Sequence, residues 1–158
     1  MNFMTRAFRE AASLVFIVTI LAVSGSAAKA DNAQVAQIKT VSGQAEIVRN
    51  GARSAARVGD PLYEKDTIET GADGAIGITF IDNTVMSGGP NSQIVLEDYK
   101  FNSSNFKGSM LTDMNRGTVS MISGDIARST PGAMKVKTPT AILGVRGTRF
   151  VIEVKDNR

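Results

Sequence analysis

Carboxylates are the most closely spaced groups in this chain that could do chemistry. Five of them fall within one short stretch, at Asp60, Glu64, Asp66, Glu69 and Asp73. Oxygen ligands of this kind can hold calcium, but a calcium-binding loop needs them at alternate positions followed by a glycine. Here the spacing is wider and Lys65 interrupts it. We therefore expect a solvated turn region without a metal, in which Asp60 caps a turn.

The sequence contains few other residues that could act in catalysis. Glu97 and Asp98 could form an acid pair for sugar hydrolysis, but neighbouring strand residues point to opposite faces, so we expect that they cannot flank one bond. The chain has no histidine and no cysteine, so neither Ser-His-Asp and Cys-His nucleophile systems nor zinc sites can be drawn from it. Gly144 and Gly147 do not form a phosphate loop, because no Lys-Ser/Thr pair follows them. The sequence predicts a protein that is not an enzyme and that has no catalytic residue, cofactor or metal.

Basic residues gather near the C-terminus. Arg146 and Arg149 lie close together, and Lys135 and Lys137 alternate upstream. If the two segments pair as strands, the four cations share one solvent face, which would attract carboxylates or phosphates. The alternative is structural, with Arg146 bound to a turn carbonyl or paired with a carboxylate of the sheet.

The N-terminus has the order of a secretory signal peptide. Arg6 and Arg9 precede an apolar run over residues 11–23, and small residues lead to Ala28-Lys29-Ala30. The run is shorter than the roughly 20 apolar residues of a membrane span. We therefore expect residues 1–30 to be a signal-peptide helix that is cleaved, with an uncleaved anchor as the alternative. The mature protein would lie in the periplasm without a stable membrane span.

The mature chain is nearly neutral. Of the 18 basic and 15 acidic residues in the whole chain, Arg6, Arg9, Lys29 and Glu10 belong to the expected signal peptide. Nucleic-acid binding needs a concentrated basic face, so we do not expect it. Without cysteine there is no disulfide, and the remaining length fits one domain.

Apolar residues of the mature chain recur at every second position. Ile76–Phe80 and Phe150–Val154 are the longest such runs, and clusters of Gly, Asn, Asp and Pro separate the runs. This period is typical of strands, and no segment beyond Gln34 has a helical stripe. We expect an all-β domain over residues 41–155 after a short lead-in over 31–40. It would form two packed antiparallel sheets, as in a sandwich or jelly roll, or a short β-solenoid.

One C-terminal segment, TPTAILGVRGTRF, combines a Pro-fixed turn, two glycines and two arginines with an apolar strand. Its signature residues are Thr138, Pro139, Thr140, Gly144, Arg146, Gly147, Thr148, Arg149 and Phe150. Four earlier elements precede it in order: Val41–Glu46, Gly59-Asp60 with Asp66–Gly71, Ala75–Asp82 with Gly89–Ser92, and Met114–Gly117. Together they resemble the FecR family of envelope proteins over most of the mature chain.

The signature residues are expected to be structural. Gly144 and Gly147 would occupy positions that need positive φ or close backbone approach. Gly147→Val is then expected to unfold the domain.

The resemblance implies a role in envelope signalling. FecR proteins of iron signalling look like relays, with a cytoplasmic anti-sigma segment, one membrane span and a periplasmic domain. Because only residues 1–10 precede the apolar run, we expect a stand-alone periplasmic FecR-like domain that acts as a protein-interaction or sensory module. Its partner would be an envelope receptor, transporter or signalling membrane protein. The alternative is a module that binds glycan or peptidoglycan.

Candidate contacts with a partner lie in the loop over residues 102–108 and on the basic strand. They are Phe101, Phe106, Lys135 and Lys137. The two phenylalanine rings could equally cover the core.

Overall fold

The computed structural model describes residues 33–147 and 149–155. The expected signal-peptide helix at residues 1–30 and Thr148 of the C-terminal signature lie outside these residues. In the described part, no helix is long and apolar enough to cross a membrane. This part is a β domain with one short helix, α1 (Asp125–Ser129).

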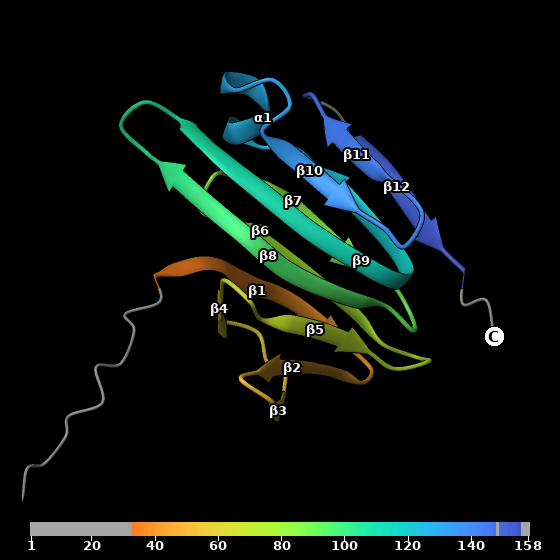
Figure 1. Ribbon diagram of the computed structural model, residues 1–158. Helices are drawn as coiled ribbons and strands as arrows, with labels where there is room; N and C mark the ends of the chain where they lie inside the picture. Colours follow the sequence, from red (N-terminus) through yellow and green to blue (C-terminus); the bar gives the residue numbers. More distant parts are fainter. Residues whose placement is uncertain (1–32, 148, 156–158) are drawn as a thin grey trace, which may run out of the picture. The chain divides into compact units, whose positions relative to one another are not determined.

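The twelve strands are joined by hydrogen bonds into one curled sheet with two halves (Figure 1). The β6 half has the order β4-β1-β6-β7-β9-β12, and all its neighbouring strands are antiparallel. Its strands are β1 (Gln34–Ser42), β4 (Pro61–Tyr63), β6 (Ala75–Phe80), β7 (Val85–Gly88), β9 (Lys107–Ile122) and β12 (Arg149–Val154).

The β8 half shares β9 and has the order β3-β2-β5-β8-β9-β10-β11. Strand β10 runs parallel to β9, and the other pairs of this half are antiparallel. Its further strands are β2 (Ala45–Arg49), β3 (Ala52–Ala55), β5 (Thr67–Thr70), β8 (Gln93–Asn102), β10 (Met134–Lys137) and β11 (Ile142–Val145).

Strand β9 serves both halves because it changes partners at Gly117. Residues up to Arg116 pair with β8, and residues from Gly117 onward pair with β12, joined by β7 from Val119. Gly117 has a φ of +92°, and a Cβ at this position would lie 2.4 Å from the Cα of Ser92. The Ser92 hydroxyl accepts a hydrogen bond from the Thr118 N–H at 3.1 Å. Positive φ and this close approach both require glycine.

A single hydrophobic cluster draws on both halves of the sheet. The predicted period of two is confirmed in β6 and β12. The alternate apolar residues are buried in β6 and packed against the cluster in β12: Ile76, Ile78, Phe80, Phe150, Ile152 and Val154.

The prediction of an almost entirely β domain is confirmed, but two details differ from what we expected. The strands form one curled sheet that is continuous through β9, and neither the two packed antiparallel sheets nor the short solenoid that we expected is seen in the described residues. The domain was expected to begin at residue 41, but β1 begins at Gln34 and pairs with β4 and β6. Val35, Ala36 and Ile38 of the expected lead-in are buried in the core.

Helix α1 was not expected, and a buried carboxylate explains its position. Asp82, in the turn after β6, is fully buried, and its oxygens accept hydrogen bonds from the Thr84 hydroxyl at 2.8 Å and the Tyr99 hydroxyl at 3.1 Å. The N–H of Ile126 points to the same carboxylate, and the N–H of Asp125 donates to the Asp82 carbonyl oxygen at 2.8 Å. These backbone contacts fix the start of the helix without an apolar stripe.

Tyr99→Phe tests how much the hydrogen bond from the Tyr99 hydroxyl to the buried Asp82 carboxylate stabilises the domain. Burial, with the nearby Asp82 charge, raises the pKa of Tyr99, so the hydroxyl remains a donor. Its ring stacks on Phe80 with centroids 5.5 Å apart, and the variant keeps that contact. We expect the unfolding free energy to fall by about 1–3 kcal/mol, because a buried acceptor loses a donor. Urea denaturation measures it. Tyr63→Phe is the control, since no hydrogen bond to the Tyr63 hydroxyl is seen in the described structure, and equal losses would contradict the account.

Candidate docking site

The sheet ends at two unpaired edges on the C-terminal side. Strand β11 pairs only with β10, and β12 pairs only with β9, within the described residues. The two edge strands lie next to each other at one end of the domain (Figure 1). Each therefore presents backbone N–H and C=O groups along one side, which is a template for pairing with another chain.

Large apolar side chains are exposed on both edge strands. Ile142 of β11 is 66% exposed, Leu143 is 42% exposed, and Val151 of β12 is 65% exposed. Ile142 lies opposite Lys137 in the register, on the outer face of the sheet, while Leu143 lies opposite the buried Val136. Apolar residues on an unprotected edge are a common mark of a protein-interaction surface.

A groove of 490 Å³ separates the two edge strands, and we name it the β11–β12 seam. Leu143 of β11 and Ile152 and Val154 of β12 form the apolar part of its lining, and polar side chains, Glu153 among them, form much of the rest. The turn between β10 and β11 closes one side through Thr138, Pro139 and Thr140.

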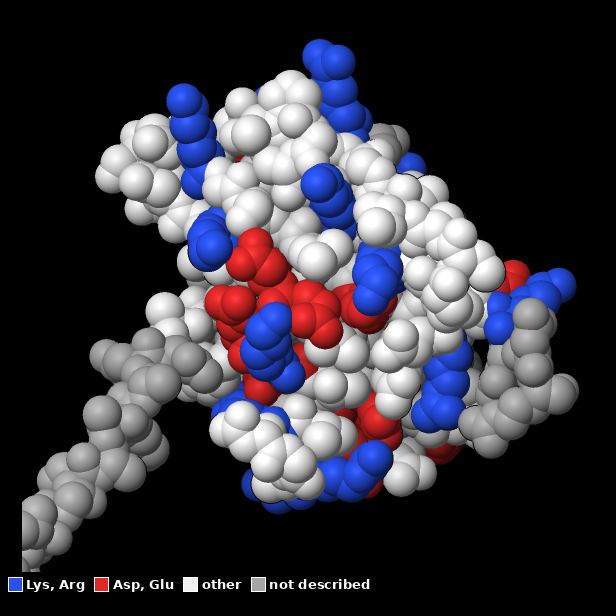
Figure 2. Space-filling model, viewed as in Figure 1, with Lys and Arg blue, Asp and Glu red and all other residues white. Residues whose placement is uncertain are grey.

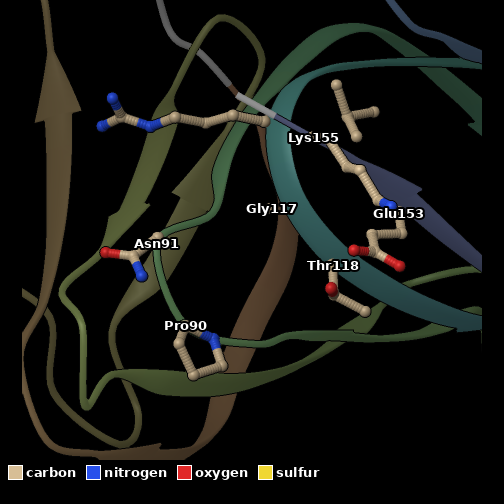
Figure 3. Close-up of a pocket in the computed structure, with 8 residues that line it drawn as sticks. Pro90, Asn91, Gly117, Thr118, Glu153 and Lys155 are labelled. Atoms are coloured by element: carbon tan, nitrogen blue, oxygen red, sulfur yellow. The ribbon is translucent and has the colours of Figure 1, made fainter. Parts of the chain in front are cut away.

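The seam continues into a second groove of 780 Å³ at the bend of β9, which we name the β9 groove. Glu153, Val154 and Lys155 line both grooves. Figure 3 shows Pro90 and Asn91 on one side of the β9 groove and Glu153 and Lys155 on the other, with Gly117 between them. The bend of β9 thus connects the apolar seam with a polar end.

Four cations at or beside these grooves make no ion pair within the described residues. Arg116 and Lys155 line the β9 groove, Lys135 lies opposite Gly144 of β11, and Arg146 follows β11. The Nε of Arg116 is buried without a hydrogen-bond partner. By contrast, Lys137 pairs with Asp113 at 2.8 Å, and this hydrogen bond raises the pKa of Lys137.

The signature residues build the turn and the two edge strands. The Thr138 hydroxyl accepts from the Ala141 N–H at 3.1 Å, and the Thr138 N–H donates to the Ala141 carbonyl at 2.8 Å. Pro139 and Thr140 are exposed in this turn, Arg146 is exposed after β11, and Phe150 is half-buried against the core. A structural role for the signature fits these positions and stays a prediction.

The expected basic face is wrong in its strand pairing. The terminal strand β12 pairs with β9 and not with β10, because β11 occupies the edge of β10. Lys135 and Lys137 lie in the β8 half, while Arg149 lies in the β6 half. The four cations therefore do not align along one strand pair.

The two signature glycines differ from each other. Gly147 has a φ of +54°, as expected, but a Cβ there would meet no atom within 4 Å. Gly144 has neither positive φ nor a close neighbour, so the expectation for this residue is wrong. The requirement for glycine at Gly147 is thus conformational and confined to an exposed turn.

The two phenylalanine rings at the β8–β9 turn have different surroundings. Phe101 packs against the core, while Phe106 is 53% exposed with a φ of +58°. Their ring centroids lie 6.5 Å apart, and the Ser129 hydroxyl donates to the Phe106 carbonyl oxygen. Of the two expected contact residues, Phe106 is therefore the exposed one, and a contact with a partner stays a prediction.

The acidic residues are engaged in structural contacts. Asp66 is buried and holds Arg49 through two hydrogen bonds of 2.8 Å. As expected, Asp60 caps a turn, accepting from the Arg57 N–H at 2.9 Å. Within the described residues, no group of three acidic side chains is placed to hold a metal.

Glu97 and Asp98 do not alternate as expected. A bulge between Leu96 and Asp98 leaves both carboxylates half-exposed between buried neighbours. Glu97 pairs with Lys65 at 2.8 Å, and Asp98 accepts from the Ser109 hydroxyl at 2.8 Å. Figure 2 shows Asp and Glu side chains gathered beside Lys and Arg side chains on the face that it presents. Ion pairing accounts for these acids without a reaction.

The fold and the open edges define a β module suited to binding. The model of the FecR protein family matches residues 66–158, which is more than half of the chain, and the chain belongs to this family. Membership associates it with envelope signalling. No curated protein and no solved structure matches the chain.

Valine substitutions at Gly117 and Gly147 test the different roles of the two glycines. Gly147→Val is now expected to cost about 1–3 kcal/mol of stability, because only the strained φ opposes it. The domain should remain folded, unlike our expectation from the sequence. Gly117→Val adds a backbone clash and should cost more than about 4 kcal/mol. Chemical denaturation followed by circular dichroism compares them, and identical transitions would contradict this assignment.

Proposed function

We propose that this chain is a periplasmic, non-enzymatic FecR-like module that binds a protein of the cell envelope and takes part in signalling. The observation that carries the proposal is the pair of unpaired apolar edge strands, β11 and β12. An extended segment of another protein can add to such an edge through backbone hydrogen bonds, with side-chain pockets giving specificity.

The non-enzymatic part of the proposal rests on the sequence. Histidine and cysteine are absent, and the acidic residues nearest each other are engaged in ion pairs or turn caps. Among the described residues that line the seam, no hydroxyl group is paired with a base as a nucleophile would be. Binding is the activity that this surface supports.

A glycan-binding role is the less favoured alternative. Stacking on sugar rings needs exposed aromatic side chains, and the chain has no tryptophan. Tyr99 is buried, and Tyr63 lies beneath the Arg49 guanidinium at 4.4 Å. Phe106 is the exposed large aromatic residue of the described part, and it is distant in sequence from the seam.

Site-specific photocrosslinking tests the proposed function. A photoreactive residue at Ile142 or Val151 should form discrete protein adducts in living cells, because both side chains are exposed on the open edge strands. The matched controls are Ala52 and Ala55, which are exposed on the edge strand β3 at the other end of the β8 half. Protein adducts from the controls alone, or none from any position, would contradict the proposal. Recovery of glycan in place of protein would favour the alternative.

Export of the chain can be tested separately. Alkaline phosphatase fused after Arg158 should be active in intact cells, because the enzyme matures only outside the cytoplasm. Leu14→Arg with Val18→Arg should abolish that activity by interrupting the apolar run. Full activity of the double variant would show that this run does not direct export. Immunoblotting of the fusion controls for its amount.

A further inference from the structure

We infer that the β11–β12 seam and the β9 groove bind an extended partner segment that carries aliphatic side chains in its part along the seam and acidic side chains in its part along the β9 groove. The inference rests on the proposed function and adds the chemistry of the partner. It follows from three features of the described structure, namely the apolar lining, the unpaired cations and the geometry of the two edges.

The apolar lining selects aliphatic side chains. Leu143, Ile152 and Val154 border the seam from two strands and are each incompletely buried. In an extended segment, every second side chain points to the same face. One set of alternate side chains can therefore enter the seam, and burial of aliphatic groups there would stabilise the complex.

The unpaired cations select acidic side chains for the part of the segment that reaches the β9 groove. Arg116 and Lys155 reach the β9 groove, and Glu153 is the acid among the residues that line it. Neither Arg116 nor Lys155 has an ion pair within the described residues, so a carboxylate of the partner in this groove could pair with them through charge-assisted hydrogen bonds.

The same charges disfavour a second copy of this chain as the occupant. A second copy paired through β11 would add its own Lys135 and Arg146 to the positive charge at this edge and would bring no acid on β11. Like charges at close range oppose such an interface. A segment with aliphatic residues followed by carboxylates complements both the seam and the β9 groove.

Peptide display tests this partner chemistry directly. A library of short random peptides is selected against the full chain, and binding of the enriched peptides is measured by fluorescence anisotropy. We expect enriched peptides to carry a run of aliphatic residues next to Asp or Glu. Arg116→Gln with Lys155→Gln should weaken their binding about tenfold or more, and added salt should weaken binding to the wild type.

The control variant is Arg57→Gln with Lys107→Gln. It also replaces one arginine and one lysine, but at exposed positions outside both grooves, so binding should be unchanged. Leu143→Ser should weaken binding without removing charge, and thermal unfolding checks that each variant is folded.

Several outcomes would overturn the inference. They are enrichment of peptides without acidic residues, failure to enrich any peptide, and equal binding by the groove variant and its control. If Ile142 still crosslinks to an envelope protein in those cases, the proposed function stands and only the partner chemistry is wrong. Absence of adducts from β11 and β12 would instead remove the proposed function itself.

Discussion

The change of partners along β9 is the constraint on which the rest of the domain depends. Its first part pairs with β8 and β10, and its second part with β7 and β12. Because one strand serves both halves, a single hydrophobic cluster can be enclosed by a continuous sheet. The same sharing leaves β11 and β12 as two separate ends, and the seam between them is a direct consequence of the bend at Gly117.

In the described structure, charged side chains are paired on the face around Glu97 and Asp113 but not at the two grooves. On the face around Glu97 and Asp113, each carboxylate has a lysine partner, and such exposed pairs contribute little to stability. At the grooves, Arg116 and Lys155 have no ion pair within residues 33–147 and 149–155. Membership in the FecR family and this uneven charge together favour a surface that is completed by another molecule.

The sequence predicted what depends on local pattern. Alternation in β6 and β12 identified their inward residues, and the Gly59-Asp60 pair identified a turn. It did not predict long-range pairing, since nothing local specifies that β10 runs parallel to β9 or that β11 covers the edge of β10. Because the observed pairing differs from the expected one, the four cations do not share one face as we had expected.

The alternation of apolar residues in the sequence also did not predict where two sets of acidic side chains lie. The bulge at Glu97 and Asp98 changes which face each carboxylate occupies, and it depends on the register with β9. Asp82 looked like an ordinary turn residue, yet its burial positions α1. The Asp82–Thr84 spacing, which allows a carboxylate to bond two residues ahead, was the available signal.

Residue-resolved hydrogen exchange of the isolated chain tests the central claim most directly. If β11 and β12 are free edges, alternate amides in Ile142–Val145 and Arg149–Val154 should exchange rapidly, while the amides of β9 are the slowest. Uniform slow exchange along both edge strands would mean that they are already covered, and it would contradict the account of an open seam.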